Sequence, residues 1–184
     1  MTSANNHAET VDFFTDNNFF GANPKQITFF QQTMLPAMDT EGKIIMKSAT
    51  EIALGPNGNG AVFESINSNP LVKAQIKASK YVQVIGVDNV MNRVLDPLHI
   101  GFTASKGFEA SLKCCKKAEP CEKVGTICVK NGKYDIVEYS EMTEEQNNKR
   151  LEDGRLYFEL GNILIFVFNS KKLIALSEDS KTLN

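Results

Sequence analysis

Apolar and polar residues follow patterns along this chain that are typical of both helices and strands. Apolar residues at helical spacing predict helices over 6–17, 61–67, 71–80 and 96–106. A further helix should begin at Thr143, where Gln146 completes a capping box. Short β-branched or alternating runs predict strands over 26–30, 43–46, 52–54, 109–116, 123–130, 134–139 and 156–160. Helices between strands predict an α/β fold with a mixed, largely parallel sheet flanked by helices.

The most apolar of these runs is YVQVIGV, over residues 81–87. Nearly every position is apolar, which predicts a strand buried on both faces, as in a parallel sheet. Asp88 and Asn89 end this run abruptly, and Asn131-Gly132 predicts a tight hairpin turn further on. Residues 169–184 are mostly polar and carry no helix cap, so we expect a polar C-terminal tail there.

Composition and charge narrow the class of protein. The 184 residues favour one domain, and 42% hydrophobic with 23% charged residues is typical of a globular protein. The formal charge of -2 gives no sequence-wide argument for binding nucleic acid or an anionic membrane. The apolar runs are shorter than the ~20 residues of a membrane span. The start of the chain lacks the features of a signal peptide, so we expect a cytoplasmic protein.

The cysteines lack the paired spacing of a zinc site. Cys114, Cys115, Cys121 and Cys128 contain no C-x-x-C motif, and both histidines lie far away in sequence. We expect buried or half-buried free thiols, with a metal site or a disulfide as the alternative.

Three segments stand where an α/β fold commonly binds ligands. The glycine-rich loop 55–60 precedes a helix, but its spacing alone leaves a plain turn open. Asp88 ends the buried strand, where it could bind Mg²⁺ bridging to phosphates or could simply cap a helix. The hydroxyl and carboxylate groups of 138–141 suit sugar hydroxyls, although taken alone they fit a solvated strand end.

Taken in order, several blocks identify a family. FFQQTMLPAMDTEGKII, PNGNGAVFESI, VIGVDNVMNRVLDPLHIGF, EKVGTICVKNGKYDIVEYSEM and DGRLYFELGNI resemble the central blocks of eukaryotic UDP-N-acetylglucosamine pyrophosphorylases. The resemblance covers Met1 to about Ile163. It implies a Rossmann-like, glycosyltransferase-A-like nucleotidyltransferase fold that is incomplete at both ends. Residues 1–168 would be part of a catalytic domain.

The resemblance also implies an activity. This family joins UTP to N-acetylglucosamine 1-phosphate, releases pyrophosphate and uses Mg²⁺. Gln32 and the backbone of Gly58 would bind uracil. They would discriminate against cytosine, because cytosine places a donor where uracil has an acceptor. Asp88 would be the catalytic residue that binds both the metal and the phosphates. Other residues would line the sugar pocket, namely Asn59, Gly125, Glu138, Tyr139 and Asn162.

The chain also departs from the family pattern. It contains no G-x-G-T-R phosphate loop, and it ends before the place of the family's later phosphate-binding lysine. Ala61 replaces the last glycine of a GNGG motif, and Ile165-Phe166 replace an asparagine-histidine pair. The sequence therefore leaves two alternatives to the pyrophosphorylase interpretation. In one alternative the chain is a truncated, non-catalytic relative that binds uridine nucleotides, and in the other it is a pyrophosphorylase for another UDP-sugar.

Overall fold

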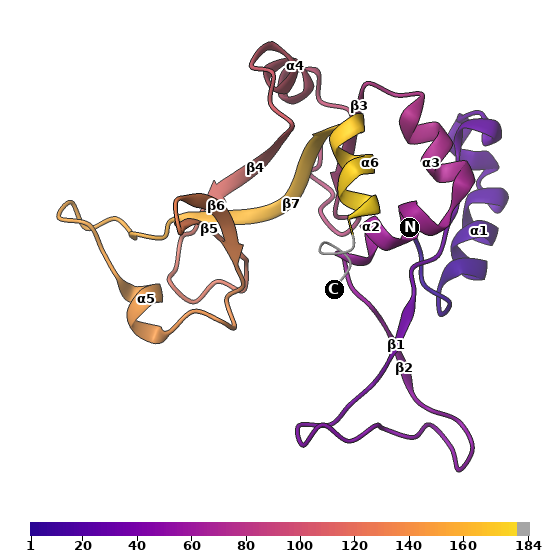
Figure 1. Cartoon of the computed structure of the whole chain (residues 1–184), viewed down its shortest axis with the longest axis horizontal. Coiled ribbons are helices and arrows are strands. Elements are labelled where there is room, and N and C mark those ends of the chain that lie inside the picture. The colour runs from indigo at the N-terminus through magenta and orange to yellow at the C-terminus, as the bar shows by residue number, and fades with distance from the viewer. Residues whose placement is uncertain (180–184) are drawn as a thin grey trace. The chain divides into compact units, whose positions relative to one another are not determined.

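The computed structural model describes residues 1–179 and divides the chain into two compact units (Figure 1). Unit 1 comprises Met1–Lys80 together with the residues from Ser170 onward, and unit 2 comprises Tyr81–Asn169. The chain thus leaves unit 1 after Lys80, completes unit 2, and returns to unit 1 for its last helix. Within residues 1–179, no helix is both long enough and apolar enough to cross a membrane.

Unit 1 is built mainly from helices. Its elements are α1 (His7–Asp16), the short 3-10 helices η1 (Asn18–Gly21) and η2 (Pro24–Gln26), β1 (Met34–Pro36), β2 (Leu54–Pro56), α2 (Ala61–Ser68), α3 (Pro70–Lys77) and α6 (Ser170–Glu178). Three predicted helices, over 6–17, 61–67 and 71–80, are confirmed. Asn69 separates α2 from α3 and caps α3, because its side-chain oxygen accepts hydrogen bonds from the N–H groups of Leu71 and Val72, each at 3.2 Å.

Helix α6 occupies part of the segment expected to be a polar tail. It contacts α2 and α3, and its residues Leu173 and Ile174 are buried together with Ile66 and Ile76 of those helices. The buried positions recur at the spacing of one helix face, so few apolar residues suffice to attach α6. Residues 180–184 of the expected tail lie outside the described residues.

A long excursion separates β1 from β2. The two strands pair antiparallel, and beyond them Met38 pairs with Ile44 and Met46 with Ile52 as single bridged pairs. The strand predicted over 43–46 is therefore wrong, since only these single pairs form there. The strand predicted over 26–30 is also wrong, because no strand forms between η2 and β1, and the strand predicted over 52–54 lies at Leu54–Pro56. Ile44 and Met46 remain about half exposed, at 51% and 52%, because no neighbouring strand covers these apolar runs.

Unit 2 contains a sheet and two helices. Its elements are β3 (Tyr81–Ile85), α4 (Pro97–Ser105), β4 (Ala110–Lys116), β5 (Thr126–Lys130), β6 (Lys133–Val137), α5 (Glu144–Asn148) and β7 (Leu160–Asn169). The helices predicted from 96 and 143 are confirmed, including the capping box of Thr143 and Gln146. The strand predicted over 156–160 is misplaced, because β7 begins only at Leu160 and takes in the apolar run that follows.

The strand order of this sheet is β3-β7-β5-β6, with β4 also paired to β7. Every pairing between the described strands is antiparallel, so the α/β class is confirmed but the largely parallel sheet is not. Strand β7 runs between β3 and β4 in the opposite direction to both. The predicted burial of the apolar run 81–87 on both faces is wrong, because all five residues of β3 are only half-buried and Val87, at the end of the run, is 97% exposed.

Candidate functional site

The loop between β2 and α2 lies against the segment that carries Gln32. The Oε1 atom of Gln32 accepts a hydrogen bond from the backbone N–H of Gly58 at 3.0 Å. Gly58 has a φ of 92°, a left-handed conformation that favours glycine. The two residues that the resemblance connects with uracil therefore touch each other within unit 1.

Further hydrogen bonds hold these two segments together. The N–H of Gln32 donates to the carbonyl of Thr2 at 2.8 Å, and the N–H of Asn57 donates to the carbonyl of Thr33 at 3.2 Å. The Thr33 hydroxyl donates to the Glu64 carboxylate on α2 at 2.9 Å and accepts from the Asn57 side-chain amide at 3.2 Å. These hydrogen bonds fix the backbone from which the half-buried Gln32 side chain projects.

The Gln32–Gly58 hydrogen bond decides which end of the carboxamide can face a ligand. Because Oε1 already accepts the hydrogen bond from Gly58, the amide nitrogen Nε2 remains available as a donor. A donor suits a carbonyl of uracil and opposes the amino group of cytosine. The Gly58 N–H is already used, so a nucleotide that binds it has to replace this hydrogen bond. Asn59, the next residue, is exposed.

In unit 2, three residues connected with the sugar lie together. The N–H of Asn162, on β7, donates to the carbonyl of Gly125, just before β5, at 2.7 Å. The Glu138 side chain covers Gly125, because a β-carbon there would lie 3.1 Å from Glu138 Oε1 and 2.9 Å from Ile136 Cγ2. This close approach requires glycine at 125. Glu138 itself is exposed, so its carboxylate can accept hydrogen bonds from sugar hydroxyls.

Tyr139 follows Glu138 in the turn after β6. The turn is closed by a hydrogen bond of 2.9 Å from the N–H of Glu141 to the carbonyl of Glu138, and Tyr139 is 43% exposed. A separate hollow of about 670 Å³ in unit 2 is lined by Glu119, Pro120, Cys121, Met142, Glu144, Asn147 and Asn148. None of the predicted site residues lines this hollow.

Asp88 is an exposed residue of the loop between β3 and α4. Its Oδ1 lies over Gly86, 2.8 Å from where a β-carbon on that residue would stand. The alternative that Asp88 caps a helix is wrong, because α4 begins later and Asp96 caps it. Within residues 1–179, no three His, Cys, Asp or Glu side chains cluster as a metal site. A single carboxylate still fits Mg²⁺ that is shared with phosphate oxygens.

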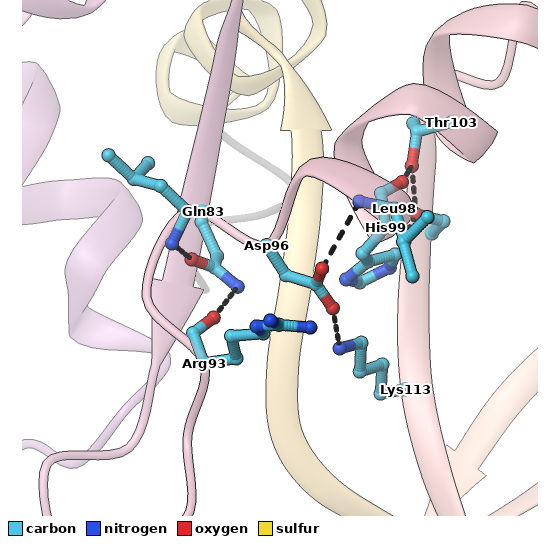
Figure 2. A network of polar contacts seen from close by, with 9 residues as sticks. Gln83, Arg93, Asp96, Leu98, His99, Thr103 and Lys113 are labelled. Carbon is cyan, nitrogen blue, oxygen red and sulfur yellow. Dashed lines mark hydrogen bonds and ion pairs between the residues drawn. The ribbon is translucent and has the colours of Figure 1, made fainter.

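A polar network joins α4 to β4 (Figure 2). The Asp96 carboxylate accepts a hydrogen bond from the N–H of Leu98 at 3.1 Å and pairs with the Lys113 ammonium on β4. The Nε2 atom of His99, on α4, is hydrogen-bonded to the Ser111 hydroxyl at 2.9 Å. Asp96 and His99 are buried, so these contacts fix the start of α4 against the sheet.

The network sets the protonation of its members. The hydrogen bond from Lys113 lowers the pKa of Asp96 below its ordinary 3.8. Burial lowers the pKa of His99 below 6.5, and the charge of Lys113 lowers it further. The buried Nδ1 of His99 has no partner among the described residues, which favours a neutral ring that donates from Nε2 to Ser111.

The cysteines are free thiols, as expected, but most of them are not buried. Cys114, Cys115 and Cys121 are exposed, and Cys128 is half-buried. The expectation of burial is wrong for the first three. Cys114 and Cys115 belong to β4, which lies at one side of β7, and Cys121 lies in the irregular segment after β4.

Comparison with known proteins relates these features to a family. A family profile described as UTP–glucose-1-phosphate uridylyltransferase matches residues 1–182. The chain belongs to this uridylyltransferase family. It is 39% identical over 166 residues to UDP-N-acetylglucosamine pyrophosphorylase of Saccharomyces cerevisiae, covering 89% of this chain and 35% of the relative. It is 33% identical over 184 residues to human UDP-N-acetylhexosamine pyrophosphorylase-like protein 1, covering all of this chain and 36% of the relative.

Solved structures of the family agree. The uridine diphosphate N-acetylglucosamine pyrophosphorylase of Trypanosoma brucei matches 99% of this chain and 37% of its own with a TM-score of 0.86 and 32% identity. A UDP-glucose phosphorylase of the same organism matches 95% of this chain and 39% of its own with a TM-score of 0.75 and 15% identity, which shows the fold alone. The chain thus has the nucleotidyltransferase fold of UDP-sugar pyrophosphorylases, and it spans about a third of the length of these uridylyltransferase relatives.

Sequence reasoning did not find Gln83 and Lys113, although both take part in the network of Figure 2. Only Asp96 carried a signal, because Asp before Pro97 is typical of a helix start. The other residues become important through contacts with positions 10 to 17 residues away in sequence, which the pattern of residues does not reveal.

Proposed function

We propose that this chain carries the uracil-binding and sugar-binding parts of a UTP-dependent nucleotidyltransferase. The enzyme would form UDP-N-acetylglucosamine and pyrophosphate from UTP and N-acetylglucosamine 1-phosphate. The observation that carries the proposal is the hydrogen bond between Gln32 and Gly58, which leaves an amide donor for a uracil carbonyl. The cluster of Gly125, Glu138 and Asn162 supports the sugar part. The 39% identity to a UDP-N-acetylglucosamine pyrophosphorylase supports the choice of sugar.

In the proposed reaction, a phosphate oxygen of the sugar phosphate attacks the α-phosphorus of UTP in line, and pyrophosphate leaves. The protein mainly positions the two substrates and stabilises the negative charge of the transition state. Gln32 would orient the base, Glu138 would accept hydrogen bonds from the sugar hydroxyls, and Asp88 would hold Mg²⁺ together with the phosphates. When bound, Mg²⁺ supplies positive charge that neutralises the phosphate oxygens.

The location is also part of the proposal. The exposed free thiols Cys114, Cys115 and Cys121 favour a reducing compartment, and we therefore propose that the protein acts in the cytoplasm.

Calorimetry and a pyrophosphate-release assay on the 184-residue chain test this function. We expect binding of UTP in preference to CTP, and binding of N-acetylglucosamine 1-phosphate once UTP is present. Equal affinity for UTP and CTP would contradict the proposal. Selective binding of UTP without any effect of the sugar phosphate would favour the non-catalytic uridine-nucleotide-binding alternative. Preference for a different sugar 1-phosphate would favour a pyrophosphorylase for another UDP-sugar.

A further inference from the structure

The loop of residues 86–96 leaves β3 and reaches α4 without regular structure. Its tip is exposed, with Val87 at 97% and Met91 at 87%. Asn89 closes a turn there, because its carbonyl accepts the N–H of Asn92 at 3.0 Å and its side chain accepts the N–H of Met91 at 3.1 Å. With so little burial, the shape of the loop depends on hydrogen bonds at its base.

Two side chains tie the outgoing limb of this loop to the returning limb. The Asn92 side-chain amide donates to the carbonyl of Gly86 at 2.7 Å. Further back on β3, Gln83 donates from Nε2 to the carbonyl of Arg93 at 3.2 Å and accepts the N–H of Leu95 at Oε1, at 2.5 Å (Figure 2). Gln83 therefore uses both ends of its carboxamide to hold two residues of the returning limb.

Leu95 has a strained backbone that needs such support. Its φ is 52°, a left-handed conformation that bulky residues rarely adopt. Its side chain is 64% exposed, so burial does not stabilise this conformation. Strained residues persist where their surroundings enforce them, and they occur often at functional sites. The Gln83 carboxamide on one side and the Asp96–Lys113 ion pair on the other supply that constraint.

The base of the loop also determines where Asp88 lies. The Asp88 carboxylate lies over Gly86, and the carbonyl of Gly86 is the group that Asn92 holds. The Asp88 carboxylate thus lies next to a backbone group that is hydrogen-bonded to the returning limb.

We propose that Gln83 is a positioning residue, which holds the 86–96 loop in the shape that presents Asp88 to Mg²⁺ shared with the phosphates of UTP. The inference rests on the proposed role of Asp88 and extends it to a residue that contacts neither metal nor nucleotide.

Gln83→Met in the full 184-residue chain tests this role, because methionine keeps the length of the side chain and removes both hydrogen bonds. Hydrogen exchange over residues 86–96 is measured in the free protein, and the affinity for UTP is measured with Mg²⁺ and with EDTA. We expect exchange to rise about tenfold and the enhancement of UTP affinity by Mg²⁺ to fall by roughly three- to tenfold, since two hydrogen bonds are lost. The affinity in EDTA should not change, whereas a general loss of structure would lower it.

Three further variants make the outcome decisive. Gln83→Glu keeps the acceptor for Leu95 but loses the donor to Arg93, so it should give a smaller effect, and it decides the matter if Gln83→Met does not fold. Gln75→Met removes a comparable hydrogen bond, to Thr28 in unit 1, and should change neither measurement. Asp88→Asn shows how far the Mg²⁺ effect can fall.

The inference and the proposed function fail in different ways. An unchanged Mg²⁺ effect or unchanged loop exchange in the Gln83 variants, while Asp88→Asn abolishes the Mg²⁺ effect, would overturn the positioning role alone. An absence of any Mg²⁺ effect in the parent chain would overturn the role of Asp88 as well.

Discussion

Replacing Gln32 with alanine should weaken UTP binding and reduce the preference for UTP over CTP. The change removes the Nε2 donor that the Gly58 hydrogen bond leaves free and that would bind uracil in the proposed function. A neutral hydrogen bond contributes about 0.5–1.5 kcal/mol, and 1.4 kcal/mol corresponds to tenfold in affinity, so we expect UTP affinity to fall by roughly two- to twelvefold. Gly58 is exposed, so its freed N–H can bind water and adds no further penalty.

Isothermal titration calorimetry with UTP and CTP measures this effect. Gln31→Ala is the matched control, because Gln31 is the neighbouring exposed glutamine and only its backbone pairs with Thr2. Gln31→Ala should leave both affinities unchanged, whereas Gln32→Ala should weaken UTP more than CTP. Unchanged UTP affinity in Gln32→Ala, or equal losses for both nucleotides, would refute the proposal that Gln32 distinguishes uracil from cytosine.

Four other outcomes are expected. Asp88→Asn should abolish the dependence of UTP binding on Mg²⁺, and a titration in which Mg²⁺ still strengthens binding as in the parent would contradict this role. Gly125→Ala should displace the Glu138 carboxylate, weaken sugar phosphate binding in calorimetry and lower stability by about 1–3 kcal/mol through overpacking, while UTP binding stays unchanged. Because the pKa of His99 is lowered, its neutral form is favoured in the folded chain, so stability should be full above pH 6.5 and decline as the pH falls below it. Urea midpoints that fall equally in His99→Gln would show that another group is responsible. The 184-residue chain alone should release pyrophosphate slowly, because it contains no G-x-G-T-R loop and each donor aimed at the transition state is worth ~10²–10³ in rate; turnover like that of a full-length relative would contradict this.

Apart from α6, which was expected to be part of a polar tail, the α-helices were predicted well because their signals are local. The capping box of Thr143 and Gln146 needs only a few neighbouring residues, and so does the cap that Asn69 provides for α3. The hairpin at Asn131-Gly132 is equally local, since both residues have a positive φ, of 53° and 76°. In contrast, the segments 26–30 and 43–46 have the composition of strands but form no regular strand, only single bridged pairs such as Ile44 with Met38, because strand formation depends on a neighbour that the local sequence does not specify.

The candidate site divides in the same way. The amino-acid sequence contains the chemical groups and their order along the chain, and these were enough to indicate the family and to suggest Gln32 for uracil and Glu138 for the sugar. It did not indicate that the Gln32 oxygen is held by Gly58, that Glu138 covers Gly125, or that Gln83 holds the loop of Asp88. These contacts join residues that are 10 to 26 positions apart, so they form only when the strands and loops that carry them come together. Residue types and local order are encoded position by position, whereas the direction in which a side chain donates or accepts depends on which distant backbone group folding brings beside it.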